Sequence, residues 1–283
     1  MGTDRVAVVT DSTAYLPPGV AAGLGVRVVP LRVSIGDREL VDGPNLPAAT
    51  VTAALRDRIQ VTTSRPSPAE FAAAFRQCLD AGATHVVAVH LAAALSGTWE
   101  SAVLAAQDFG YGVVRVVDSR STAAALGFAV RAAAERAVDG ASAAQVQGAA
   151  TDVVDRTRTL FYVDTIEYLR RGGRVGTASA LVATSLSVKP LLQMVEGRIV
   201  PLEKVRTSAK AIARLVQLTA QAAGHDRVDL AVHHLAAPDR ADAVSQQVRA
   251  ALPDVGESII AEVGPVIGAH LGPGVIGTVV VRR

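Results

Sequence analysis

The first half of the chain alternates short apolar runs, rich in β-branched residues, with longer alanine-rich amphipathic stretches. The apolar runs predict strands at Arg5–Thr10, Val26–Leu31, His85–Val89 and Val113–Val117. The amphipathic stretches predict helices at Pro47–Arg58, Pro68–Leu79, Thr98–Phe109, Thr122–Val138 and Ala143–Arg156. Continuous valine-rich strands separated by helices are typical of a parallel sheet that is covered on both faces.

The second half of the chain has a different rhythm. Its apolar runs Leu191–Val195 and Arg198–Val205 flank Glu196-Gly197, a dipeptide that predicts a hairpin and therefore antiparallel pairing. Further elements are expected as helices at Thr207–Ala223 and Pro238–Leu252 and as strands at Arg227–His233, Ser258–Glu262 and Val275–Val281.

The strand pattern gives way to a segment rich in glycine and arginine near Val163–Thr165, where we place a domain boundary. We therefore predict an α/β protein of two α/β domains. Residues 1–163 form the first, with a mainly parallel sheet flanked by helices. Residues 164–283 form the second, with a mixed or antiparallel sheet and helices.

Composition narrows the class of protein. The chain has 283 residues, of which 50% are hydrophobic and only 4% aromatic, so disorder is excluded and the core must be built from Ala, Val and Leu. Twenty-eight Lys and Arg residues against 26 Asp and Glu give a formal charge of +2. This balance, with no basic run, argues against a nucleic-acid partner.

Location is also constrained by the sequence. The N-terminal residues run directly into a strand and lack the apolar core of a signal peptide. The uncharged stretch Val263–Val281 contains Pro265, Pro273, His270 and five glycines, which is a poor composition for a membrane-spanning helix. We expect a cytoplasmic protein without stable membrane insertion, in which the single Cys78 is a small buried side chain.

Several catalytic motifs are absent from the sequence. It contains no phosphate-binding loop, no dinucleotide-binding glycine pattern and no G-x-S-x-G elbow. None of the six histidines has a partner at helical metal-ligand spacing, and His233-His234 is expected to place one ring in the core and the other in solvent. We expect no metal and no cofactor of the chain's own.

Hydroxyl groups gather where predicted strands end and helices begin. Four clusters share this placement: Thr10–Thr13, Thr62–Pro68, Ser96–Thr98 and Asp118–Thr122. At the carboxyl edge of a parallel sheet such loops meet, and helix N-termini there favour an anion. Ser, Thr and Asp are also the preferred helix caps, so the pattern by itself indicates only a small anion or a polar head group.

Two glycine-rich segments carry further candidate side chains. In Arg170–Arg174 two glycines separate arginines, which allows a tight turn with guanidinium groups facing a common point, or a plain surface turn. Gly264–Gly274 surrounds His270 with Gly and Pro, which predicts a rigid loop that approaches a ligand, or a structural histidine.

These segments together resemble the DegV family of bacterial fatty-acid-binding proteins, some of which are the lipid-presenting subunit of a fatty acid kinase. The resemblance spans nearly the whole chain, with the motifs in the family's order. It rests on Thr10–Thr13, Thr63–Ser67, Leu95–Thr98, Asp164–Arg174, Lys189-Pro190 and Gly264–Gly274.

The resemblance implies two α/β domains and one long-chain fatty acid with its chain in a buried tunnel. By motif match, Thr63 and Ser96 hold the carboxylate, and His270 lies near it. Arg171 and Arg174 are implicated near the head group or in partner docking, with supporting positions at Ser64, Gly97 and Thr98. The chain would be a non-catalytic subunit, and a separate ATP-binding kinase subunit would phosphorylate the carboxylate.

Three positions depart from the family's pattern. Arg65 replaces the usual Gln, and Ala92 and Ala93 replace serines that many members carry before Leu-Ser-Gly-Thr. The head-group site is therefore expected to have fewer hydroxyl donors.

Two other functions fit some of the same residues. A hydrolase of a small ester would use Ser96 as the nucleophile, His270 as the base and Asp118 to orient it. A binding module for a phosphorylated metabolite would use the arginine turn.

Overall fold

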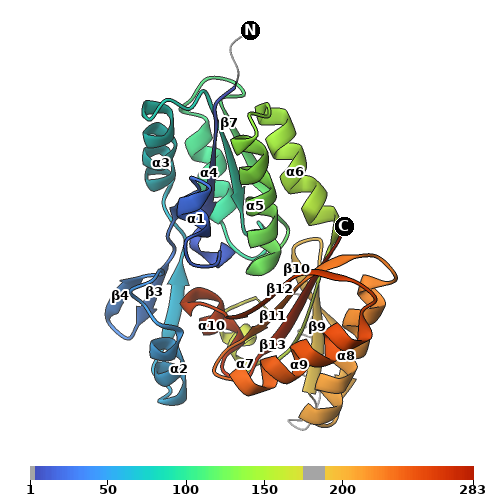
Figure 1. Cartoon of the computed structure of the whole chain (residues 1–283). Coiled ribbons are helices and arrows are strands. Elements are labelled where there is room, and N and C mark those ends of the chain that lie inside the picture. Colours follow the sequence, from blue (N-terminus) through green and yellow to red (C-terminus); the bar gives the residue numbers. More distant parts are fainter. Residues whose placement is uncertain (1–3, 175–188) are drawn as a thin grey trace. The chain divides into compact units, whose positions relative to one another are not determined.

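The computed structural model describes residues 4–174 and 189–283, in which the chain divides into two compact units (Figure 1). The first unit contains the chain up to Arg32 together with Val41–Gly43 and Ser64–Asp155. The second unit contains Val33–Leu40, Pro44–Thr63 and Arg156–Arg283. Residues 33–40 and 44–63 thus group with the C-terminal part of the chain, and the domain limits 1–163 and 164–283 stay a prediction.

A four-stranded sheet forms the centre of the first unit, with the order β2-β1-β6-β7. All three neighbouring pairs are parallel, which confirms the predicted parallel sheet. The strands are β1 (Val6–Asp11), β2 (Arg27–Val29), β6 (His85–His90) and β7 (Val114–Asp118). Because they run in parallel, Asp11, His90 and Asp118 end three adjacent strands at one edge of the sheet.

The strands of this sheet carry apolar side chains on both of its faces, so helices pack against each face. The first unit contains η1 (Ser12–Ala14), α1 (Val20–Gly23), α3 (Pro68–Asp80), α4 (Thr98–Ala106), α5 (Ala124–Val138) and α6 (Ala143–Arg156). Phe71 and Phe75 of α3 pack with Val86 and Ala88 of β6, whereas α5 contacts β1 and β6 through its own buried stripe. A capping box between Ser67 and Glu70, followed by Pro68, begins α3.

The second unit is built on a six-stranded mixed sheet with the order β10-β9-β8-β13-β11-β12. Of its neighbouring pairs only β11 and β12 are parallel, which confirms the predicted mixed sheet. The strands are β8 (Thr157–Tyr162), β9 (Lys189–Val195), β10 (Arg198–Val205), β11 (Val228–His234), β12 (Val255–Glu262) and β13 (Ile276–Arg282). The predicted hairpin joins β9 and β10, with positive φ angles at Glu196 and Gly197.

Two long helices pack on this mixed sheet and share its main core. These are α8 (Ser208–Ala223) and α9 (Pro238–Ala251), whose Leu215 and Val244 are fully buried with Leu230 and Val280 of the strands. Two short helices, α7 (Glu167–Arg171) and α10 (Pro265–Leu271), contact each other, and α10 also contacts α2 (Ala48–Arg56).

Three strands were missed by the hydrophobic pattern. These are β3 (Arg32–Ile35), β4 (Arg38–Val41) and β5 (Val61–Ser64), which form a three-stranded sheet with the order β4-β3-β5. Each has only four residues and mixes charged or hydroxyl side chains with apolar ones. Such short strands lack the continuous apolar run on which the other strand predictions rest.

Two local predictions were wrong. The segment Gly264–Gly274 is not a loop, because Pro265 occupies the first turn of helix α10 and Gly272, with a φ of 74°, follows its end. His233 and His234 are both buried, since all seven residues of β11 are buried. Neither ring therefore lies in solvent.

Cys78 lies half-buried in α3, and burial raises the pKa of its thiol. Within residues 4–174 and 189–283, no helix has both the length and the apolar composition to cross a membrane.

Candidate functional site

The candidate residues are distributed over both units. Thr63, Arg171, Arg174 and His270 belong to the second unit. The first unit contains Ser64, Ser96, Gly97 and Thr98. Each group is therefore described within its own unit.

Thr63 lies within a strand and not in a loop between a strand and a helix, as the sequence interpretation had it. It is the third residue of β5 in the three-stranded sheet, where Thr62, Thr63 and Ser64 alternate in exposure. The sequence pattern did not predict this strand because β5 is short and polar. Its hydroxyl nevertheless has a specific partner within the second unit.

That partner is His270, on α10. The Oγ1 atom of Thr63 lies 2.8 Å from Nε2 of His270, whereas Nδ1 of the ring is buried with no hydrogen-bond partner among the described residues. Burial, with a smaller contribution from the positive charge of Arg174, lowers the pKa of His270 to about 4. The ring is therefore neutral at physiological pH.

Glycine is required beside this ring. A Cβ atom on Gly172 would lie 2.2 Å from Nδ1 of His270, although the backbone of Gly172 has an ordinary φ of −74°. A Cβ atom on Gly272 would similarly lie 2.1 Å from the Tyr168 ring. The glycines of the two motifs therefore let α7 and α10 approach each other closely, which the sequence interpretation did not identify.

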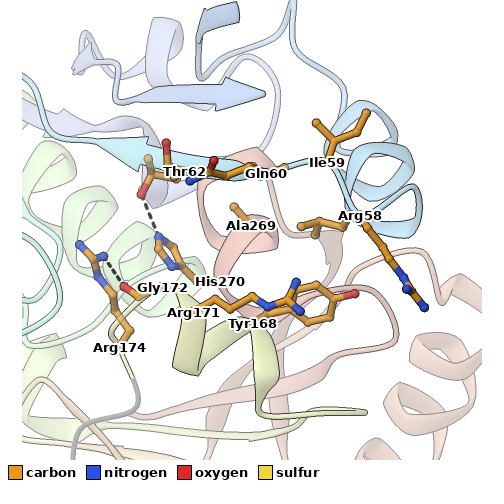
Figure 2. A pocket seen from close by; sticks show the side chains of 13 residues that line it. Arg58, Ile59, Gln60, Thr62, Tyr168, Arg171, Gly172, Arg174, Ala269 and His270 are labelled. Atoms are coloured by element: carbon orange, nitrogen blue, oxygen red, sulfur yellow. Dashed lines mark hydrogen bonds between the residues drawn. The ribbon is translucent and has the colours of Figure 1, made fainter. Parts of the chain in front are cut away.

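A pocket opens beside Thr63 and His270 (Figure 2). Its volume is about 450 Å³, and its walls come from β5 and the segment before it, from α7 and from α10. Figure 2 shows Tyr168 and Arg171 along one side, Gln60 and Thr62 along the other, and Ala269 and His270 between them. Arg58 and Gln60 are lining residues that no motif indicated, and Tyr168 lies in the Asp164–Arg174 motif but was not singled out as a site residue.

The arginine segment does not direct its guanidinium groups to a common point. Glu167 accepts hydrogen bonds from Arg170 and Arg171, and these bonds hold the pKa of its carboxyl at about 2. Arg174 instead donates to the carbonyl of Gly172. Helix α7 begins at Glu167, and residues three and four positions later lie on the same face of a helix. Arg170 and Arg171 therefore pair with Glu167, whereas the sequence interpretation expected all the guanidinium groups to face one point.

Ser96 lies in the loop between β6 and α4 of the first unit. Its Oγ atom is 2.9 Å from Oγ1 of Thr98 and accepts a 3.4 Å hydrogen bond from the backbone amide of Thr98. Gly97 packs under Arg65, whose guanidinium pairs with Glu100 at 3.4 Å. The residue that departs from the family's Gln thus covers the glycine of the Leu-Ser-Gly-Thr motif.

The hydrogen bonds of a Ser–His–Asp hydrolase differ from those in the structure. Oδ1 of Asp118 accepts from the amides of Ala93 and Arg120, and Nε2 of His270 is bonded to Thr63. Nδ1 of His270, which would donate a hydrogen bond to an orienting carboxylate, has no partner in the described part of the chain. These bonds do not favour the hydrolase alternative.

One buried pair of polar side chains was also missed. Nδ1 of His90 lies 3.1 Å from Oδ2 of Asp11, and both side chains are fully buried at the carboxyl ends of β6 and β1. Asp11 was included in a hydroxyl cluster, whereas no motif indicated His90. Among the described residues, no group of three or more His, Cys, Asp or Glu side chains could hold a metal ion.

Comparisons with known proteins agree with one another. A family model described as "Uncharacterised protein, DegV family" matches residues 5–283. A DegV domain-containing protein of Streptomyces coelicolor is 50% identical over 279 residues, which cover 99% of each chain.

Two solved structures extend the likeness to the fold. A Thermus thermophilus DegV family protein, described by its fatty acid binding, is 35% identical with a TM-score of 0.93, covering 99% of this chain and 100% of that one. Bacillus subtilis DegV, described as a fatty acid binding protein, is 30% identical with a TM-score of 0.89 at the same coverage. The α/β fold is therefore shared with both.

Proposed function

The chain belongs to the DegV family, and we propose that it binds a long-chain fatty acid and presents the carboxylate to a separate ATP-dependent kinase subunit. The acyl chain lies in a buried apolar tunnel, and Thr63 and Ser96 each donate a hydrogen bond to the carboxylate. The chain itself forms no bond, and the kinase subunit supplies ATP and magnesium. The relatives described as fatty-acid-binding support the ligand class.

The observation that carries this proposal is the hydrogen bond between Thr63 and His270. Gly172 packs against Nδ1 of the ring, and Nδ1 is buried with no hydrogen-bond partner among the described residues. Because an unpaired buried N–H group is rarer in proteins than an unpaired acceptor, this favours the tautomer with a lone pair on Nδ1 and a proton on Nε2. His270 then donates to Thr63 Oγ1, which leaves the hydroxyl proton of Thr63 to donate to a ligand oxygen.

The energetics assign different roles to the tunnel and the head-group site. About 15 methylene groups, each contributing roughly 0.8 kcal/mol on burial, give on the order of 12 kcal/mol gross. A hydrogen bond to a charged group contributes only about 1.5–3 kcal/mol. Affinity therefore comes mainly from the tunnel, whereas Thr63 and Ser96 fix which end of the ligand faces the kinase.

Neutral donors suit a carboxylate that must later react. A buried ion pair with an arginine would hold its negative charge tightly and weaken it as a nucleophile toward a phosphoryl group. Hydroxyl groups orient the oxygens without neutralising them. Arg171 and Arg174 line the pocket, and we assign them to the head group or to partner docking.

The first test is to purify the protein without added lipid, denature it, extract with organic solvent and identify the extract by mass spectrometry. We expect near-stoichiometric fatty acid. A phosphorylated metabolite, or no lipid, would overturn the proposed ligand class. Acyl phosphate should form only when the fatty acid kinase subunit, ATP and magnesium are added together, and formation by the chain alone would contradict the non-catalytic role.

The second test uses fatty acid affinity in Thr63→Val, which keeps the shape of the side chain and removes the hydroxyl, against Thr63→Ser, which keeps the hydroxyl. We expect Val to weaken binding about tenfold and Ser to retain most of it, since one charge-assisted hydrogen bond is lost only in Val. Equal affinities in the two variants would remove Thr63 from the site.

A further inference from the structure

The loop between β6 and α4 begins with three backbone amides that all have acceptors outside the loop. The amide of Leu91 donates to Oδ2 of Asp11 at 2.9 Å. The amide of Ala92 donates to the carbonyl of Ser121 at 2.8 Å, and that of Ala93 to Oδ1 of Asp118 at 3.1 Å. Asp11 ends β1 and Asp118 ends β7, the two strands that flank β6, so the loop is held from both sides.

This support extends to Ser96 through Ala92. The carbonyl of Ala92 accepts hydrogen bonds from the amides of Leu95 and Ser96, at 2.9 and 3.2 Å. The Ser96 backbone is therefore positioned by the peptide group between Ala92 and Ala93. The amide of that group, on Ala93, donates to Asp118 at the end of β7, and the preceding amide, on Ala92, donates to Ser121. Thr98 then fixes the side chain through its hydroxyl.

The two carboxylates differ in how they are used. Asp11 is fully buried, and each of its oxygens accepts two hydrogen bonds, from the Thr13 amide and hydroxyl on one and from His90 and Leu91 on the other. Asp118 is only partly buried and accepts both of its bonds on Oδ1, from Ala93 and from Arg120 at 2.8 Å. An asparagine could reproduce the bonds of Asp118 with its single amide oxygen, but not those of Asp11.

We propose that Asp118 is a positioning residue for Ser96, and that Asp11 holds the same loop from the side of β1. This inference rests on the proposed function, because it requires the Ser96 hydroxyl to contact the fatty acid carboxylate. It also accounts for Ala92 and Ala93, where the family often has serine. The loop is held through the amides of these residues, which every residue type except proline supplies.

The experiment compares Asp118→Ala with Asp118→Asn, and each in combination with Ser96→Ala. Fatty acid affinity is measured by displacement of a fluorescent fatty acid, and urea unfolding identifies the folded variants. We expect Ser96→Ala to weaken binding about tenfold and Asp118→Ala severalfold, but no more than Ser96→Ala. Asp118→Asn should stay within about twofold of the wild type, because it keeps the acceptor oxygen.

The double variant separates positioning from a general loss of structure. If Asp118 acts through Ser96, Asp118→Ala changes affinity less than about twofold once Ser96 is alanine. Equal weakening in both backgrounds, or no weakening in the wild-type background, would overturn the inference. A further readout is the carboxyl resonance of palmitate labelled with ¹³C at that carbon, which in Asp118→Ala should move toward its position in Ser96→Ala.

Failure of the premise is distinguishable from failure of the inference. Unchanged affinity in Ser96→Ala removes Ser96 from the proposed site and the inference with it, whatever Asp118 does. Weakened binding in Ser96→Ala with additive effects of Asp118→Ala leaves the proposed function intact and overturns the positioning role alone. Because Asp11→Asn leaves donors without acceptors in the core, it serves only as a stability comparison, in which it should be less stable than Asp118→Asn.

Discussion

The two units hold their candidate hydroxyls in different ways. In the second unit, Thr63 depends on one side chain, His270, whose ring packs against Gly172. In the first unit, Ser96 depends on peptide groups that are anchored to the ends of neighbouring strands. A hydroxyl held by a partly buried ring is sensitive to acid and to added bulk, whereas one held by peptide groups tolerates side-chain changes in its own loop.

The largest expected effect is the loss of folding stability at acid pH that His270 causes. Because the pKa of His270 falls from its ordinary value of 6.5 to about 4, the unfolded chain binds a proton that the folded chain does not between those values. The contribution to stability is therefore fully present above pH 6.5 and is lost as the pH falls toward 4, amounting to roughly 3 kcal/mol.

Urea unfolding of the wild type and of His270→Gln between pH 7 and pH 4 measures this loss. The variant should lose less stability, because glutamine does not titrate. His225→Gln, at an exposed position of the same unit, is the control and should follow the wild type. Buried His233, whose pKa burial also lowers to about 4, contributes equally in all three proteins, so parallel curves for wild type and His270→Gln would contradict the assignment.

Substitution by alanine should destabilise the protein differently at two glycines that have similar backbone angles. Gly172 and Gly97 have φ angles of −74° and −70°, so alanine is strained at neither by its backbone. At Gly172 the new methyl group meets the partly buried ring of His270, and we expect a loss of about 1–3 kcal/mol. At Gly97 it meets the exposed side chain of Arg65, which can move aside, so the loss should stay below about 0.5 kcal/mol.

Unfolding free energies and fatty acid affinities of Gly172→Ala and Gly97→Ala measure this contrast. Gly172→Ala should also weaken binding, since displacing His270 removes the partner of Thr63. Equal losses in the two variants would mean that the ring is no more rigidly held than the Arg65 side chain.

The smallest effect is expected at Glu167. Its ion pairs with Arg170 and Arg171 are exposed on a short helix, so Glu167→Gln should change stability by less than about 0.5 kcal/mol. The substitution should affect only Arg170 and Arg171, whose guanidinium groups lose the carboxylate that pairs with them. Thermal unfolding at low and at 0.5 M salt gives the comparison, and a loss above about 1 kcal/mol would indicate a wider role.

Sequence patterns predicted the fold where elements are long and strongly periodic. The valine runs of β1 and β6 and the amphipathic stripes of α3 and α8 are confirmed with ends displaced by at most one residue. The pattern failed at β5, whose four residues carry two threonines and a serine, and at α10, where proline and glycine suggested a loop. Strand β5 is too short and polar for the pattern, whereas at α10 the proline in the first turn and the glycine after the last are ordinary helix limits that we interpreted as a loop.

The candidate site was only partly accessible from the sequence. Thr63 and His270 were named from separate motifs, and their hydrogen bond joins segments that local patterns cannot connect. Asp11 and Asp118 can hold the loop after β6 because their strands, β1 and β7, flank it. The sequence does not give this strand order, which the structure shows. The need for glycine at position 172 is evident only from the His270 ring that packs beside it.

The long sequence separation of one hydrogen bond has a consequence for how the protein is made. Thr63 and His270 are 207 residues apart, and His270 lies close to the C-terminus. During synthesis, β5 and α2 leave the ribosome long before α7 and α10, with which they line the pocket. A chain that stalls or is cut before residue 265 contains most of its helices and strands yet has no finished pocket, so ligand capture would report complete synthesis.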